Sequence, residues 1–251
     1  MTLQNGPGTK PNRRARHRSF RLSAAGVSWV GLVRRPNEDV ASVNGERVGA
    51  LAAKTWVRRR HVLLVADGIG GHAGGEVASD LAVRILEAQA ADLADREAVT
   101  ALVQAANRRI YEAADRVPEL RGMGTTIAAA VASAAEVLWV NAGDSRIYLV
   151  TRSGLRRLSV DHAIGSALTQ ALGGADHLTE VVPASGVAPW GPGDRILLCS
   201  DGLTDVVDDA ELEAVLQAGR DDVVAARDLL RLTRDRGAPD NVTLLIATNQ
   251  G

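Results

Sequence analysis

The sequence has little of several residue types, and each scarcity excludes a class of protein. Cys199 is the single cysteine in 251 residues, so the chain cannot form an internal disulfide, which favours a reducing compartment. Aromatic residues make up only 3% of the chain, so Val, Ala, Leu and Ile must fill the core. No apolar run approaches the roughly 20 residues that a membrane-spanning helix needs. We therefore expect a cytoplasmic protein without a membrane span.

Acidic residues are scarce at the start of the chain, although the formal net charge is only −1. Residues 1–60 hold 13 Lys+Arg against 3 Asp+Glu, and the excess lies mainly in 10–21 and 54–61. Such basic segments can bind nucleic acid or an acidic membrane surface, or they can be solvated leaders. Residues 1–22 show no aromatic interleaving, no helical periodicity and no apolar signal-peptide core. We expect a basic, disordered tail there, with no specific nucleic-acid partner.

The remaining residues, 23–251, are predicted to form one folded domain in which strands cluster and helices come in pairs. Apolar residues at helical spacing predict helices, and short apolar runs bounded by turns predict strands. The expected helices are 75–93, 95–117, 208–219 and 221–237. The expected strands are 25–31, 39–44, 61–66, 125–133, 136–143, 145–151, 155–159, 178–185, 194–201 and 241–248. The clustering favours the α+β class, with two packed sheets that carry helix pairs outside.

A glycine-rich loop follows the strand at 61–66, in the stretch VADGIGGHAGGEVAS. Its glycine spacing is close to that of a dinucleotide-binding turn, in which backbone amides and a helix N-terminus face a pyrophosphate. Asp67 stands directly before the glycines and would repel that pyrophosphate. The expected acidic strand end about 20 residues later is replaced by a helix, and hairpins follow instead of parallel crossovers. These features disfavour a nucleotide site.

Acidic residues recur beside apolar strands. Asp67, Asp144 and Asp201 each follow a strand, Asp240 precedes one, and the pair Glu38 and Asp39 precedes another. A single such aspartate is usually a turn former. Five such places can instead converge at one edge of a sandwich, where a cation must offset their repulsion. Oxygen ligands without a Cys/His cluster suit Mg²⁺ or Mn²⁺ rather than zinc.

Eight motifs carry a resemblance to a known family. They are RRPNED, VADGIGGHAGGEVAS, GMGTT, VNAGDSRIYLV, LSVDHA, LTQALG, GDRILLCSDGLTD and PDNVTLLI. In this order they resemble the metal-dependent serine/threonine phosphatases of type 2C, the PPM family, over about residues 24–248. The resemblance implies a four-layer αββα sandwich, in which two antiparallel β-sheets are flanked by helix pairs.

The resemblance also implies a site with two Mg²⁺ or Mn²⁺ ions. Asp67 matches the carboxylate that bridges both ions, and the Gly68 carbonyl completes the coordination of one. Asp201 and Asp240 match ligands of the second ion. A water shared by the two ions would supply the hydroxide that attacks phosphorus directly. Further roles implied are water-mediated metal contacts for Glu38 and Asp39, and a third metal site at Asp144 and Asp205.

Two basic residues are candidates for catalytic roles. Arg34 matches the arginine that holds the substrate phosphate, since a guanidinium can grip two phosphate oxygens. Arg35, its neighbour, serves as the comparison. Some relatives carry a histidine directly after the Asp-Gly pair, where it is proposed to protonate the leaving alkoxide, but that position is Ile69 here. His72 comes four residues after that pair, in the form GGH, and could approach the site from the loop or support the start of the helix. The flap that family members carry between the DH and LTQALG motifs is nearly absent here, which implies a more open site.

The implied function is a phosphatase that acts on phosphoserine and phosphothreonine in proteins and opposes a bacterial Ser/Thr kinase. We expect it to be a monomer. The alternative is a non-catalytic protein of the same fold that binds a regulatory partner. The presence of all core carboxylates favours the enzyme.

Overall fold

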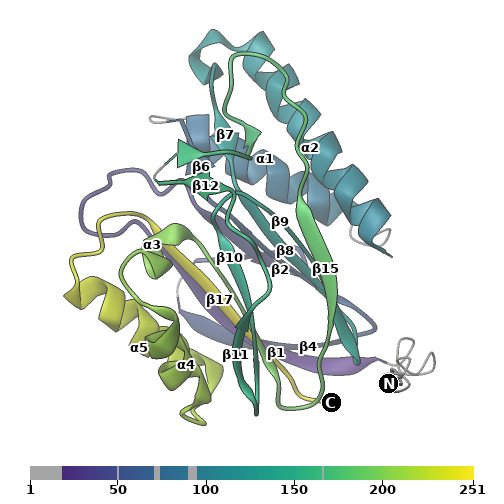
Figure 1. Cartoon of the computed structure of the whole chain (residues 1–251), viewed down its shortest axis with the longest axis vertical. Coiled ribbons are helices and arrows are strands. Elements are labelled where there is room, and N and C mark those ends of the chain that lie inside the picture. The colour runs from purple at the N-terminus through teal and green to yellow at the C-terminus, as the bar shows by residue number, and fades with distance from the viewer. Residues whose placement is uncertain (1–18, 50, 71–73, 90–94, 166) are drawn as a thin grey trace, which may run out of the picture.

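The computed structural model describes residues 19–49, 51–70, 74–89, 95–165 and 167–251. Two six-stranded antiparallel sheets stack on each other, and pairs of helices cover their outer faces (Figure 1). The predicted α+β class and four-layer αββα arrangement are therefore confirmed.

The first sheet has the strand order β11-β10-β16-β17-β1-β4. Its strands β1 and β17 come from the two ends of the described chain and pair from Leu22 opposite Asn249 to Trp29 opposite Val242. This pairing places the segment before β17 beside the loop after β1. The bounds are β1 (Phe20–Trp29), β4 (Ala52–Arg58), β10 (Arg146–Thr151), β11 (Gly154–Arg157), β16 (Arg195–Cys199) and β17 (Val242–Asn249).

The second sheet has the order β15-β9-β8-β5-β2-β3. Its central strands are β5 and β8, and every residue of both is buried. The bounds are β2 (Val40–Val43), β3 (Glu46–Val48), β5 (His61–Ala66), β8 (Ile127–Ala132), β9 (Glu136–Ala142) and β15 (Ala184–Pro189). Short strands form two small sheets near one end of the sandwich: β6 (Gly68–Ile69), β7 (Gly124–Thr125) and β14 (Leu172–Gly173) in one, and β12 (Ala163–Ile164) with β13 (Ala167–Leu168) in the other.

Helices α1 (Gly74–Ala88) and α2 (Arg96–Arg116) pack on the second sheet, while α3 (Asp201–Thr204), α4 (Asp209–Gln217) and α5 (Asp222–Asp235) pack on the first. A 3₁₀ turn, Pro118–Leu120, follows α2. Aspartate side chains cap α2, α4 and α5 by accepting hydrogen bonds from backbone amides of the first turn, which explains why these helices begin where the sequence predicts. None of the described helices is long and apolar enough to cross a membrane.

Three apolar clusters separate the four layers, and alternation along the strands builds them. On β5, Leu63 and Val65 face the space between the sheets, whereas Val62 and Leu64 face α1 and α2. Strand β17 alternates in the same way. Leu245 and Ala247 face the space between the sheets, whereas Leu244 and Ile246 face α4 and α5. Continuous apolar runs are therefore needed on central strands, because both of their faces are buried.

The structure differs from the sequence-based expectations in three segments. The stretch between 44 and 61, expected as a connection, forms the edge strands β3 and β4, which expose most of their residues and so lack an apolar pattern. The strand expected at 178–185 lies at Ala184–Pro189 instead, because its backbone pairs with β9 only from Ala184 onward. Strand β1 begins at Phe20, inside the expected tail, because the Phe20 side chain is buried between the sheets; residues 1–18 lie outside the described residues.

Candidate metal centre

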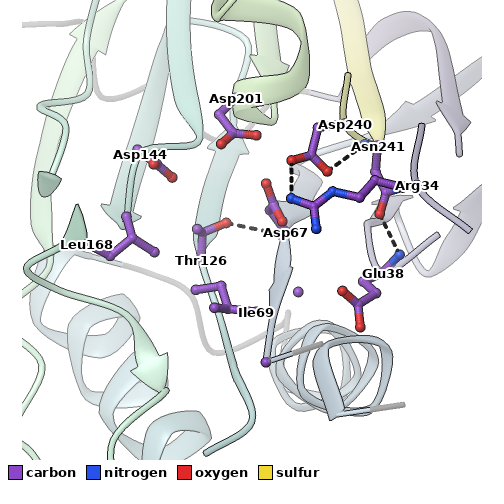
Figure 2. A pocket seen from close by; sticks show the side chains of 12 residues that line it. Arg34, Glu38, Asp67, Ile69, Thr126, Asp144, Leu168, Asp201, Asp240 and Asn241 are labelled. Carbon is purple, nitrogen blue, oxygen red and sulfur yellow. Dashed lines mark hydrogen bonds and ion pairs between the residues drawn. The ribbon is translucent and has the colours of Figure 1, made fainter. Parts of the chain in front are cut away.

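One pocket at an end of the sandwich collects the acidic strand ends (Figure 2). Its volume is about 240 Å³. Carboxylates approach it from five segments of the chain, and one arginine stands at its rim. The lining residues are Arg34, Glu38, Asp67, Gly68, Ile69, Gly70, Thr126, Asp144, Leu168, Asp201, Asp240 and Asn241.

The strands place each carboxylate. Asp67 follows β5 directly, and Asp201 comes two residues after the end of β16. Asp144 lies in the turn between β9 and β10, and Asp240 comes two residues before β17. Glu38 lies before β2, on the long loop that follows β1. The structure thus brings residues far apart in the sequence to one end of the two stacked sheets, as the pattern of strand ends predicts.

Glycines allow the segments of the pocket to approach each other closely. A Cβ atom added to Gly68 would lie 2.4 Å from the Gly75 carbonyl group, and one added to Gly202 would lie 2.0 Å from the Asn241 carbonyl oxygen. The first contact packs the Asp67 loop against the start of α1. The second packs the Asp201 turn against the segment that carries Asp240. Any side chain at Gly68 or Gly202 would push these carboxylates apart.

The electrostatics of the pocket disfavour ionised carboxylates. Burial raises the pKa of Asp67 well above its ordinary value, and the charges of Asp39 and Asp201 raise it further. Burial and the nearby Asp144 raise the pKa of Asp201 to about 7. Burial also raises the pKa of Glu38. Ionised carboxylates that repel one another, and whose pKa values are all raised, are stabilised by a cation placed among them.

The pocket fits a hard divalent cation. Glu38 Oε1, Asp39 Oδ1 and Asp201 Oδ1 are buried and have no hydrogen-bond partner among the described residues. All candidate donors are oxygens, as Mg²⁺ and Mn²⁺ prefer. The described residues do not include three His, Cys, Asp or Glu side chains already drawn together as one compact ligand cluster. The carboxylates surround the pocket instead, so a cation would draw them inward.

Asp39 does not line the pocket but lies behind it. Its side chain is only 6% exposed, and its Oδ2 accepts a 2.8 Å hydrogen bond from Ser200 Oγ. Burial raises the pKa of Asp39 to about 6. Asp39 thus connects the segment before β2 to the residue that precedes Asp201.

Arg34 points into the pocket and is bound there. Its Nη2 donates a 2.8 Å hydrogen bond to Asp240 Oδ2 (Figure 2). The neighbouring Arg35 is not among the lining residues. The Arg34 side chain is 58% exposed, so this ion pair is largely solvated and breaks at little cost.

Two lining residues to which sequence analysis assigned no role, Thr126 and Asn241, hold the site together. Thr126 Oγ1 accepts a 3.0 Å hydrogen bond from Asp67 N and lies 2.7 Å from Ser145 Oγ. Asn241 Oδ1 accepts from Glu38 N at 2.9 Å, and its Nδ2 donates to the Val30 and Pro36 carbonyls. Thr126 lies in the motif GMGTT and Asn241 in the motif PDN. Their side chains bond only to backbone groups and a hydroxyl, and such contacts cannot be recognised from the spacing of residues in the sequence.

Replacing Thr126 by valine is expected to lower Mn²⁺ affinity by about 10- to 100-fold, as loss of supporting hydrogen bonds around a metal site commonly does. Valine keeps the shape of threonine but cannot bond to Asp67 N. Isothermal titration with Mn²⁺ measures the effect, with Thr151→Val on β10 as the control. Equal affinities in the Thr126→Val and parent proteins would remove Thr126 from the site.

The Asp144 turn is fixed by a neighbouring segment. Gly143 N donates a 3.2 Å hydrogen bond to His162 Nδ1, and His162 N donates to the Gly143 carbonyl at 3.0 Å. Arg146 donates to both carboxylate oxygens of Asp161 at 3.0–3.2 Å from its Nε. His162 is therefore a structural partner of the Asp144 turn.

The remaining candidate residues are less centrally placed. Asp205 follows α3, is exposed and does not line the pocket, although its charge contributes to the raised pKa of Asp144. His72 lies outside the described residues. The short hairpin of β12 and β13 stands where a flap was expected to be nearly absent, and its Leu168 lines the pocket.

Comparison with known sequences points to one group of enzymes. Residues 49–231 match the family model described as Protein phosphatase 2C. The serine/threonine phosphatase stp of Listeria innocua is 34% identical over 240 residues, which cover 86% of this chain and 91% of that protein. The serine/threonine protein phosphatase PstP of Mycobacterium tuberculosis is 34% identical over 255 residues, which cover 90% of this chain and 45% of PstP.

Solved structures give the same result. The catalytic domain of PstP in complex with two manganese ions is similar with a TM-score of 0.74 at 33% identity, covering 91% of this chain and 98% of that one. PppA, a regulatory component of T6SS in Pseudomonas aeruginosa, is similar with a TM-score of 0.74 at 30% identity, covering 91% of this chain and 97% of that one.

Proposed function

The chain belongs to the protein phosphatase 2C family and is a serine/threonine protein phosphatase, and we propose that the acidic pocket is its catalytic centre. The substrates are phosphoserine and phosphothreonine side chains of proteins. The observation that carries the proposal is the meeting of Glu38, Asp67, Asp201 and Asp240 at one pocket with Arg34 at its rim.

Two divalent cations, Mg²⁺ or Mn²⁺, are the proposed cofactors. Asp67, which lies centrally among the carboxylates, would contact both ions. The carbonyl of the lining residue Gly68 would complete the coordination of one ion, and Asp201 and Asp240 would hold the second. Glu38, and Asp39 behind it, would act through water. When bound, such a pair of ions lowers the pKa of a shared water enough to supply hydroxide near neutral pH. Asp144 and Asp205 are the proposed ligands of a third, weaker site.

Arg34 is proposed to hold the substrate phosphate. Its guanidinium already points into the pocket, where it binds the Asp240 carboxylate. A phosphate offers two oxygens in a similar geometry and a larger charge. Arg34 would therefore exchange Asp240 for the phosphate, and Asp240 would become available to a cation. The solvated character of the Arg34–Asp240 pair makes this exchange cheap.

Replacing Arg34 by alanine is expected to lower kcat/KM for a phosphothreonine peptide by about 10²-fold, the range that follows loss of one donor to a developing oxyanion. Arg35→Ala is the matched control and should stay within about twofold of the parent, since surface charges contribute little. Steady-state kinetics at saturating Mn²⁺ measures both. Equal losses in the two variants would mean that Arg34 supplies only general positive charge.

The leaving alkoxide must gain a proton, and His72 remains the proposed donor. It follows the glycines of the Asp67 loop by sequence.

A phosphatase of this class would oppose a Ser/Thr kinase on shared protein substrates. We propose that it works as a monomer in the cytoplasm, where Cys199, which is buried in β16, stays reduced. The non-catalytic alternative is disfavoured, because each carboxylate proposed as a core ligand is present and faces the pocket.

Substrate class is tested with paired peptides that differ only in the phosphorylated residue. With Mn²⁺, we expect phosphate release from phosphoserine and phosphothreonine peptides and much slower release from the phosphotyrosine peptide. Faster hydrolysis of the phosphotyrosine peptide would contradict the proposed substrate class. Failure to hydrolyse any of them, in a folded protein that binds Mn²⁺, would favour the partner-binding alternative.

A further inference from the structure

Strand β4 is an edge of the first sheet, and its outer side is open to pairing. Among the described residues, β4 pairs only with β1 (Figure 1). Six of its seven residues are exposed, and Val57 is 64% exposed. An exposed edge strand presents unpaired backbone N–H and C=O groups that can accept another strand.

The hydrogen-bond alternation of β1 shows which groups face outward. Arg21 N donates to the Gly251 carbonyl and Arg21 O accepts from Gln250 N, so the backbone of Arg21 faces β17. Backbone groups alternate along a strand, so the next residue, Leu22, faces β4 and bonds to its partner Trp56. The backbone groups of Ala53, Thr55 and Val57 therefore point away from β1, towards solvent.

A cavity lies under this edge, between β4 and the edge strand β3 of the other sheet. Its volume is about 130 Å³, and Ala24, Val48 and Trp56 are among its lining residues. In β-strand addition, backbone bonds supply affinity and pockets receive every second side chain. A strand added to β4 would direct alternate side chains over this cavity, which suits a small apolar residue.

The charge of the edge selects the partner. Arg58 and Arg59 are exposed on or directly after β4, and Arg21 is exposed on the neighbouring strand. Lys54 is also exposed, but it pairs with Glu46 on β3, so the excess positive charge comes from the three arginines. A second copy of the chain would bring an equally basic strand, which like charges oppose. An acidic strand would be attracted instead.

We propose that the β4 edge binds an extended acidic segment of a partner protein, with small apolar side chains at alternate positions, by adding it as a further strand of the first sheet. This surface is separate from the acidic pocket. It goes beyond the proposed phosphatase activity and does not depend on it.

The test uses a fluorescein-labelled peptide of seven residues, Glu-Val-Asp-Val-Glu-Val-Asp, with anisotropy as the readout on the full chain. Thr55→Pro removes one outward N–H but leaves the bonds to β1 intact, since proline is tolerated at such edge positions. We expect saturable binding that is at least about tenfold weaker in Thr55→Pro, whereas the matched Thr55→Ala stays within about twofold. The double variant Arg58→Glu with Arg59→Glu should also lose at least about tenfold.

Hydrolysis of p-nitrophenyl phosphate should be unchanged in all of these variants, which shows that they fold. Several results would overturn the proposal. They are no saturable binding at millimolar peptide, equal binding of a peptide with lysine in place of its acids, and Thr55→Pro binding as the parent does. Equally tight binding of single-stranded DNA, unaffected by Thr55→Pro, would show a general polyanion surface. A dimer in sedimentation that Thr55→Pro dissociates would show that the edge pairs with a second copy.

Discussion

Replacing Asp67 by asparagine is expected to reduce turnover of a phosphothreonine peptide on the order of 10³-fold or more, the largest effect of any single substitution in this chain. Asp67 stands at the centre of the pocket, with Asp201 on one side and Glu38 on the other (Figure 2). An asparagine amide has the same shape but carries no charge and offers only one oxygen. It therefore cannot contact two cations or offset their charge. Steady-state kinetics over a Mn²⁺ titration measures the loss.

A second readout separates this role from a general loss of structure. Burial and neighbouring charges raise the pKa of Asp67, so its ionised form destabilises the folded protein when chelator holds the cations. With EDTA at neutral pH, Asp67→Asn should unfold at a higher temperature than the parent, and added Mn²⁺ should stabilise it less. Asp80→Asn is the control: Asp80 lies on α1, pairs with Arg47 and does not line the pocket, so its loss should change neither activity nor the Mn²⁺ response. An active Asp67→Asn enzyme would refute the assignment.

Mn²⁺ affinity is expected to rise by at least about tenfold per pH unit between about pH 5 and pH 7, because ligand carboxylates must lose protons to bind. Burial raises the pKa of Asp39 to about 6 and that of Asp201 to about 7. Burial and neighbouring charges also raise the pKa of Asp67 well above its ordinary range. Below these values protons compete with the cation. Isothermal titration at a series of pH values measures the slope.

The same groups predict the opposite trend for stability in EDTA. Between an ordinary aspartate pKa of about 4 and the raised values, the folded protein binds more protons than the unfolded chain. The contribution of these groups to the free energy of unfolding is therefore largest below about pH 4 and falls as the pH rises towards 7. Thermal unfolding at a series of pH values gives the free energy of unfolding of the parent and of Asp201→Asn. The difference between the two isolates the contribution of Asp201. A pH-independent difference, together with a flat Mn²⁺ affinity, would contradict the account.

The layered fold could be predicted from the sequence because strands in the middle of a sheet have a recognisable apolar pattern. Strands β5 and β17 are buried on both faces, so they read as unbroken apolar runs. Aspartate caps mark the starts of α2, α4 and α5. The edge strands β3 and β4 were missed because their residues are mostly exposed, and nothing in an exposed polar sequence distinguishes a strand from a loop.

The site was predictable to the extent that it consists of charged residues beside strands. Asp67, Asp201 and Asp240 reach one pocket because antiparallel neighbours bring strand ends together. The supporting contacts were not predictable. Asn241 joins the segments at 30–38 and 240–241, which are about 200 residues apart in the chain, and that contact exists only once β1 and β17 pair. The pairing of Arg34 with Asp240 has the same origin.

A catalytic centre built on two cations is tested most directly by phosphate release from a phosphothreonine peptide, measured on one protein sample with Mn²⁺ removed and then restored. We expect no turnover in EDTA, recovery on addition of Mn²⁺, and saturation of the rate as calorimetry shows the second Mn²⁺ ion bind per chain. Turnover that persists undiminished in EDTA, or a folded chain that binds two Mn²⁺ ions and hydrolyses nothing, would contradict this assignment.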